Sequence, residues 1–119
     1  MATLAEYKLG SDIIHSFDFI DSDSNDILLS SLDGYGVAVY NPDGTLLGKW
    51  GINLTGFTAD TAKFNASGTS EATLKITGGT YTQVGTYQGE LYMAYEDTDF
   101  PDELRDLAST RNDIFIIRR

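Results

Sequence analysis

Short runs of alternating apolar and polar residues, separated by clusters of Asp, Asn, Ser and Gly, set the pattern of this chain. The clearest run extends over residues 12–21. In an extended strand it places one set of side chains on one face, namely Ile13, His15, Phe17 and Phe19, and the other set on the opposite face, namely Ile14, Ser16, Asp18 and Ile20. Because successive side chains of a strand point to opposite faces, this period of two predicts a β-strand with one buried face.

Further strands are expected along the rest of the chain. The sequence Asn41-Pro42-Asp43-Gly44 predicts a type I turn, since Pro presets φ at the second position and Gly suits the fourth. The strands on either side of it then form a hairpin. The expected longer strands cover residues 35–40, 45–50, 72–77, 86–96 and 114–117, and shorter pieces are expected near residues 27–29, 55–57 and 62–64. The last strand is apolar on both faces, which predicts that it is covered on both sides.

One helical signal stands out, over residues 100–108. Asp99 suits a helix cap, Pro101 a first turn, and Asp102 and Glu103 favour the positive end of the helix dipole. The spacing of Phe100, Leu104 and Leu107 gives them a shared face. We therefore expect an all-β, mainly antiparallel fold of the sandwich class, with one short helix before the last strand. Residues 1–11 are expected to be an N-terminal arm and residues 12–119 a single domain.

Composition narrows the function classes. The chain has 119 residues, 41% of them hydrophobic, which suits one domain with one core. Its 8 Lys and Arg against 18 Asp and Glu give a net charge of −10, and such a surface repels nucleic acid. No apolar run has the length of a membrane helix, and the N-terminus does not read as a signal peptide. With no cysteine, the chain has no disulfide, no thiolate metal site and no cysteine nucleophile.

Two acidic stretches are candidate sites. Asp21, Asp23 and Asn25 place oxygen ligands at alternate positions, as a calcium loop does. However, Asp26 stands where such a loop needs Gly and Leu32 where it needs a bidentate Glu, so a hydrogen-bonded turn is the preferred interpretation and no tight calcium site is expected. The second stretch offers carboxylates for acid–base chemistry but is better read as a solvated loop entering the capped helix; it comprises Glu96, Asp97, Asp99, Asp102 and Glu103.

No catalytic site and no cofactor site is predicted. His15 is the only histidine and lies among apolar residues, so we expect a core or interface residue. The aromatic residues form either a binding platform or part of the core, the core being favoured; they are Trp50, Phe57, Tyr81, Tyr87, Tyr92 and Tyr95. Among all residues, the predicted interaction set is Tyr7, Trp50, Tyr92, Ile114 and Ile116.

The order of features also suggests a family. The features come in a fixed order. An apolar strand from Phe17 leads into an Asp-rich turn, which is followed by Leu32-Asp33-Gly34-Tyr35, Pro42-Asp43-Gly44 and a return strand to Trp50. Later, Thr82-Gln83-Val84-Gly85-Thr86-Tyr87 precedes a long strand. This order resembles the immunoglobulin-like domains of tailed-phage virion proteins, especially the N-terminal domain of the upper baseplate protein family. The resemblance spans residues 12–117 and implies an immunoglobulin-like β-sandwich with a structural role in the virion. Upper baseplate proteins continue beyond this domain, so the short chain favours a decoration or adaptor protein.

The expected function is therefore that of a non-enzymatic structural protein of a bacteriophage virion (decoration, adaptor, tail or baseplate), assembled in the host bacterial cytoplasm and acting by protein–protein docking. Its expected partners are other virion proteins, with a homo-oligomer possible and no nucleic acid or membrane. The alternative is a carbohydrate- or calcium-binding β-sandwich, motivated by the tyrosines and the acidic turns. An enzyme ranks last, because it needs a site that the sequence does not display.

Overall fold

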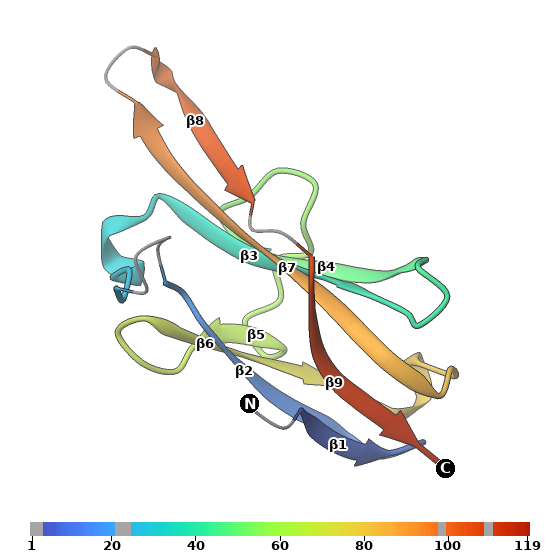
Figure 1. Cartoon of the computed structure of the whole chain (residues 1–119). Coiled ribbons are helices and arrows are strands. Elements are labelled where there is room, and N and C mark those ends of the chain that lie inside the picture. The colour runs from blue at the N-terminus through green and yellow to red at the C-terminus, as the bar shows by residue number, and fades with distance from the viewer. Residues whose placement is uncertain (1–3, 21–24, 98–99, 109–110) are drawn as a thin grey trace.

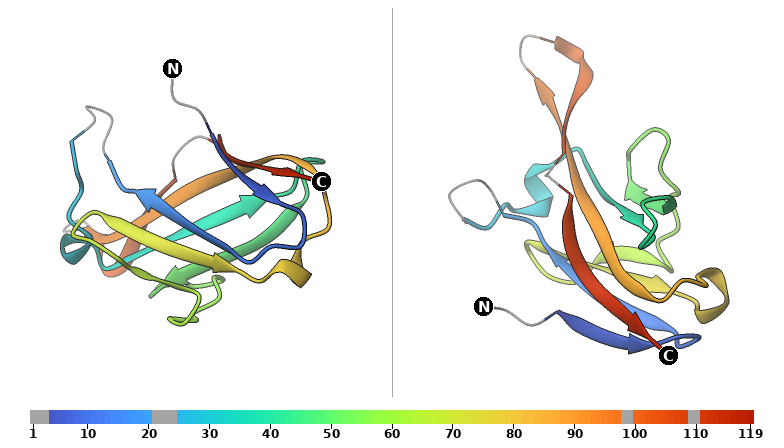
Figure 2. Two further views of the ribbon diagram at one scale, coloured as in Figure 1. Left: turned by 90° about the horizontal axis from the view of Figure 1, so that it is seen from below. Right: turned by 45° about the vertical axis from the view of Figure 1, so that its right-hand side comes forward.

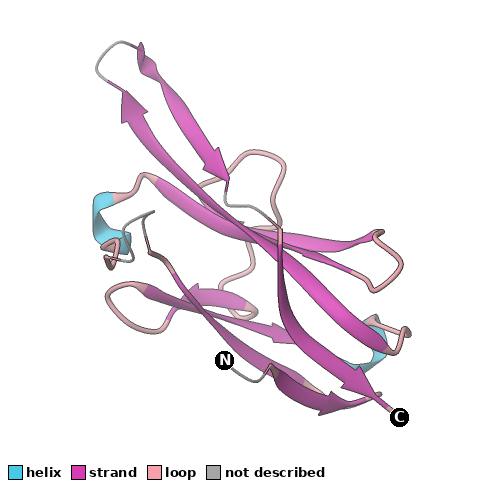
Figure 3. Cartoon of the chain, in the orientation of Figure 1, coloured by secondary structure: helices cyan, strands magenta, loops and turns pink. Residues whose placement is uncertain are grey.

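Two β-sheets make up this molecule (Figures 1 and 3). The computed structural model describes residues 4–20, 25–97, 100–108 and 111–119, and the side chains of residues 96–110 lie outside that description. The larger sheet has the order β1 (Ala5–Lys8), β9 (Asn112–Arg118), β7 (Gly85–Asp97), β3 (Gly34–Tyr40) and β4 (Leu46–Ile52), with β8 (Phe100–Ala108) also paired to β7. The smaller sheet has the order β2 (Ile13–Asp18), β6 (Glu71–Ile76) and β5 (Phe64–Ala66).

The strand pairs are antiparallel except for β1 with β9, which is parallel. The two sheets lie one over the other with their inner faces sharing the core, a β-sandwich-like arrangement (Figure 2). The prediction of an all-β, mainly antiparallel fold is therefore confirmed.

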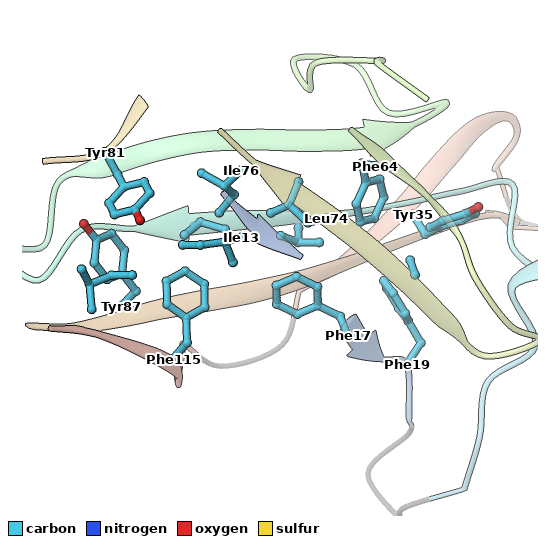
Figure 4. Close-up of a cluster of buried hydrophobic side chains, with 14 of the residues drawn as sticks. Ile13, Phe17, Phe19, Tyr35, Phe64, Leu74, Ile76, Tyr81, Tyr87 and Phe115 are labelled. Carbon is cyan, nitrogen blue, oxygen red and sulfur yellow. The ribbon is translucent and has the colours of Figure 1, made fainter. Parts of the chain in front are cut away.

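The core is built from the inward faces of both sheets (Figure 4). On β2, Ile13 and Phe17 are buried while Ile14 and Ser16 are exposed, as the alternation predicts. Rings from neighbouring strands of the larger sheet pack together in this core: Tyr87 of β7 stacks on Phe115 of β9 with centroids 5.1 Å apart. Burying large apolar side chains in this way is the main favourable contribution to folding.

The hairpin between β3 and β4 turns at the predicted place. The amide of Asn41 donates to the carbonyl of Thr45 over 2.8 Å, and the amide of Gly44 donates to the carbonyl of Asn41 over 2.8 Å. Gly44 has φ of 89°, a conformation that side chains rarely tolerate. The Asp43 carboxylate accepts bonds from both the amide and the hydroxyl of Thr45, which lowers the pKa of Asp43. The turn sequence therefore fixes the register of the hairpin.

The predicted helix over residues 100–108 is wrong: this segment is strand β8. It pairs with β7 from Tyr92↔Ala108 to Asp97↔Phe100. A lone helix of this length is marginal, so pairing with a long neighbouring strand overrides the local helix signals. The only helical turns in the described ranges are short 3₁₀ turns at Leu29–Ser31 and Gly78–Thr80. The brief strand expected near residues 27–29 is not formed.

Strand β7 extends beyond the sandwich. Its pairing with β3 ends at Gly34↔Ala94, whereas its pairing with β8 continues to Asp97. The end of this hairpin therefore projects from the body as a two-stranded ribbon (Figure 1). Strands β9 and β8 occupy the same edge of β7 one after the other.

The segment predicted as an arm contributes a strand of its own. Residues Ala5–Lys8 pair with β9 in the register Ala5↔Phe115 to Lys8↔Arg118. Arg118 and Glu6 form an ion pair across this edge. Strand β1 thus joins the larger sheet, while β2, which follows it after a tight turn at Gly10, enters the smaller one (Figure 1).

Candidate docking surface

A groove of about 360 Å³ opens along one side of the sandwich, between β2 of the smaller sheet and β7 and β9 of the larger one. Its walls come from both sheets, and they are His15, Ser16, Phe17, Asp18, Ile20, Gly89, Leu91, Asn112, Asp113 and Ile114. We call this site the side groove. It borders both sheets and carries a predicted interaction residue, Ile114.

The β2 wall of the side groove is a sheet edge. Within the described residues, β2 pairs with a strand on its β6 side only. The amide of Phe19 donates to the carbonyl of Ser70 over 2.8 Å, so the backbone amide of Phe19 points toward the β6 side. Because backbone groups alternate along an antiparallel strand, the amides of Ser16 and Asp18 point away from β6, toward the open edge. This edge offers backbone donors and acceptors to an incoming chain.

Tyr7 covers the other end of the same edge. Its hydroxyl donates to the carbonyl of Ile14 over 3.3 Å and lies 3.1 Å from Nδ1 of His15. The rings of Tyr7 and Phe115 pack edge to face with centroids 5.5 Å apart. Burial raises the pKa of Tyr7 and lowers the pKa of His15, since both charged forms lose water. The predicted interaction residue Tyr7 therefore closes one end of the open edge of β2.

The floor of the side groove is apolar because of a bulge in β9. The register between β7 and β9 shifts between Tyr87 and Gln88. The extra residue lets Ile114 pack inward beside Phe115, in place of the strict alternation of a regular strand. A Cβ on Gly89 would lie 3.1 Å from Cγ2 of Ile114, so the glycine makes room for this side chain. Ile20 at the rim is 45% exposed.

The charge of the side groove is negative. Asp18 and Asp113 are exposed, and no Lys or Arg is among the lining residues. Gln88 donates to Asp113 over 2.9 Å, which restricts the position of that carboxylate. His15 favours its neutral form, because burial lowers its pKa. A cationic side chain therefore finds two carboxylates here and no competing positive side chain.

The other predicted interaction residues lie elsewhere. Trp50 packs against the core at the β4 edge, over Gly48. Tyr92 lies on the outer face of the larger sheet, in edge-to-face contact with Phe57 at 5.0 Å. Ile116 is half-buried and pairs with Thr86 and Glu6. The structure thus brings Tyr7 and Ile114 to one region and leaves Trp50, Tyr92 and Ile116 outside it.

The outer face of the larger sheet is occupied by contacts within the chain. Arg111 lies 3.5 Å above the ring of Tyr40 and 3.7 Å from the carboxylate of Glu90. The Glu90 hydrogen bond and burial raise the pKa of Tyr40 to about 12. Lys49 lies 5.4 Å from the Phe57 ring centroid. Since these aromatic and charged groups are engaged with one another, this face presents no open aromatic platform around them.

The acidic stretches give no site that can be built from side chains. Asp21 and Asp23 lie outside the described residues, as do the side chains of the second stretch, while Asn25 is exposed. Among the residues that the structure describes, no three His, Asp or Glu side chains gather as a metal site would require. None of the described helical turns has the length and apolar character needed to cross a membrane. The calcium and carbohydrate alternatives stay predictions.

Sequence reasoning missed most of the side groove. Ile20, Leu91 and Asp113 belong to three separate segments of the sequence. The pairing and packing of their strands brings them to one groove. The exposed Ile20 carried one usable signal, because it is an apolar residue on the solvent side of β2.

Comparison with known proteins gives no assignment. No protein-family model matches the chain, and no curated protein matches it.

Proposed function

We propose that this chain is a non-enzymatic structural protein of a bacteriophage virion, assembled in the cytoplasm of its bacterial host, and that it acts by docking onto other virion proteins. The observation that carries the docking role is the side groove, an apolar and acidic hollow bordered by an open strand edge. The virion context rests on the resemblance of the sequence to immunoglobulin-like domains of tailed phages. Decoration, adaptor, tail and baseplate positions all suit such a domain.

The strand order supports an immunoglobulin-like topology. Strands β2, β6 and β5 correspond to B, E and D of that fold, and β9, β7, β3 and β4 to G, F, C and C′. The pairs β2–β6, β3–β7 and β7–β9 are antiparallel, as this correspondence requires. Few known sheet arrangements share this strand order, so the match supports an immunoglobulin-like fold. It does not indicate a function, because sandwiches of this fold serve many functions.

A second feature favours the same fold. Tyr87, the third residue of β7, is fully buried and its hydroxyl donates to the carbonyl of Gln83, four residues upstream, over 2.7 Å. A tyrosine at the start of strand F that bonds back to the preceding backbone is the tyrosine corner of immunoglobulin-like sandwiches. The chain departs from antibody domains in having no cysteine pair.

The projecting ribbon of β7 and β8 also suits a docking protein. A two-stranded ribbon without further strands is marginally stable in water, so contact with a neighbouring subunit would stabilise it. In the proposed topology it lies between strands F and G, where such sandwiches carry binding loops.

The proposal is tested by isolating phage particles from the source host on a density gradient and quantifying peptides of this chain by mass spectrometry. We expect the chain to sediment with the particles at a constant ratio to their major protein. A host cytosolic protein serves as the control and should stay at the top of the gradient. Recovery of the chain only with that control would overturn the proposed function.

A further inference from the structure

We infer that the side groove receives an extended, positively charged segment of another protein, which adds a strand to the open edge of β2. The inference rests on the proposed docking function and names the partner of that same site.

The backbone of β2 is available for pairing over the right length. The amides of Ser16 and Asp18 point to the open side, as the Phe19–Ser70 bond requires. Tyr7 closes this edge near Ile14, so an added strand would start beyond it and run toward Ile20. Addition of a peptide strand to a sheet edge is a common recognition mode, in which main-chain bonds give affinity and pockets select side chains.

The other edges suit this role less well among the strands whose side chains are described. The edge of β4 is already bridged, because Thr58 exchanges backbone bonds with Gly51 and Lys49 at 3.0 and 2.9 Å. Strands β5 and β1 have three and four residues. Strand β2 combines six residues, an open side among the described strands and an adjoining groove.

The floor of the groove selects apolar side chains. Every second residue of an added strand would point into the groove, where Phe17, Leu91 and Ile114 offer apolar surface. Ile14 and Ile20 are 62% and 45% exposed and flank the edge of β2 at its two ends. The apolar residues of an alternating partner segment would cover the groove floor, and its polar residues would lie on the opposite face, the face of Ile14 and Ile20.

Charge argues for a basic segment and against a second copy of this chain. Asp18 and Asp113 stand at the rim, and the lining holds no Lys or Arg. The whole chain carries a net charge of −10, so two copies repel each other on approach. Lys or Arg side chains on the partner would meet the two carboxylates and gain long-range attraction as well.

The first test measures hydrogen exchange of the full chain, free in solution and in purified particles, for peptides that cover residues 13–20. Because edge amides of the free chain are unprotected, we expect exchange there to slow by about tenfold or more in the particle. Peptides covering the exposed turn at residues 43–45 serve as the control and should keep their rate. Unchanged exchange over residues 13–20 in particles that contain the chain would overturn the inference and leave the proposed function standing.

The second test uses matched variants. Ile20→Asp places a charge on the rim of the groove, and Leu46→Asp places one at a similarly exposed site on β4, Leu46 being 47% exposed. We expect Ile20→Asp and the double variant Asp18→Lys/Asp113→Lys to lose incorporation into particles by about tenfold, and Leu46→Asp to retain it. Equal incorporation of all variants, with melting temperatures equal to that of the unmodified chain, would contradict the inference.

Two further outcomes separate the inference from the proposed function. A dimer in light scattering that Ile20→Asp converts to a monomer would overturn the inference, since the occupant would then be a second copy. Should the chain be absent from particles, the virion function fails and the groove is tested with a probe: a nine-residue peptide of alternating Lys and Val. Amide shift changes at Ser16 and Asp18 with this peptide, and none with its Glu–Val counterpart, would support the inference, and no change with either would overturn it.

Discussion

The hydroxyl of Tyr7 lies 3.1 Å from Nδ1 of His15, and this contact joins β1 of the larger sheet to β2 of the smaller one. His15 also packs edge to face against Phe17 and Phe115, with centroids 5.1 and 5.3 Å apart. The imidazole therefore sits between the sheets with aromatic neighbours on several sides.

This setting predicts a pH-dependent stability. Burial lowers the pKa of His15 below its usual 6.5, so in the window between the lowered pKa and 6.5 the unfolded chain binds the proton and the folded chain does not. The free energy of unfolding should be unaffected by His15 above pH 6.5, fall as the pH drops through that window, and level off below it. Urea unfolding from pH 7.5 to 5 measures this, and His15→Gln, with no other histidine in the chain, should flatten the dependence. An equal slope in both proteins would contradict the assignment.

The hydrogen bond of the buried Tyr87 hydroxyl predicts a loss of stability when that oxygen is removed. Tyr87→Phe keeps the buried ring but deletes the bond to the Gln83 carbonyl, and should lower the free energy of unfolding by about 1–2 kcal/mol. Tyr92→Phe is the control, since the described contact of Tyr92 with Phe57 uses its ring, and it should change stability by less than about 0.5 kcal/mol. Urea titration compares the two; equal effects would argue against a structural role for the Tyr87 hydroxyl.

Substitution by alanine should change the stability of the protein very differently at two adjacent glycines. A Cβ on Gly78 would overlap the carbonyl oxygen of Gly10, whereas a Cβ on Gly79 would meet nothing within 4 Å. Gly78 also donates its amide to Asp12 over 2.8 Å, so it has little freedom to move away. Gly78→Ala should cost about 3 kcal/mol, and Gly79→Ala should be neutral or slightly stabilising. Thermal melting of both variants checks this, and similar melting temperatures would disprove the close approach.

The outer face of the larger sheet predicts one unusual titration. Tyr40 should ionise near pH 12, because its hydroxyl bonds to the Glu90 carboxylate and its ring is partly desolvated. Glu90→Gln removes the negative charge and should bring the pKa of Tyr40 back toward about 10. The ¹³Cζ shift of labelled tyrosines follows each ring separately. A Tyr40 pKa that is the same in both proteins would refute the coupling.

Much of the fold follows from local sequence. The alternation in residues 12–21 predicts the buried face of β2, and Asn41-Pro42-Asp43-Gly44 predicts the turn of the β3–β4 hairpin; both are confirmed. The predicted helix over residues 100–108 is wrong for a physical reason. Asp99, Pro101 and the apolar spacing indicate only the local preference of this segment for a helix. The partner that decides the outcome, β7, lies outside that window.

The candidate site could not be predicted in the same way. The sequence predicts Ile114 as an interaction residue, but strict alternation places it opposite Phe115. The bulge between β7 and β9 at Gln88 lets both side chains pack inward. Trp50 is predicted as an interaction residue, and it packs against the core. Whether an apolar residue lines a groove depends on register and bulges, which arise from pairing between distant segments.

The continuity of β7 has a mechanical consequence. Its 13 residues run without interruption from the interior of the larger sheet into the projecting ribbon. Tension applied at the ribbon therefore acts along the strand axis, and the hydrogen bonds to β3 and β9 on either side bear that load in shear, many at once. A subunit gripped by its ribbon would thus resist pulling with its whole central sheet, so that a grip on this small protrusion would hold the entire domain.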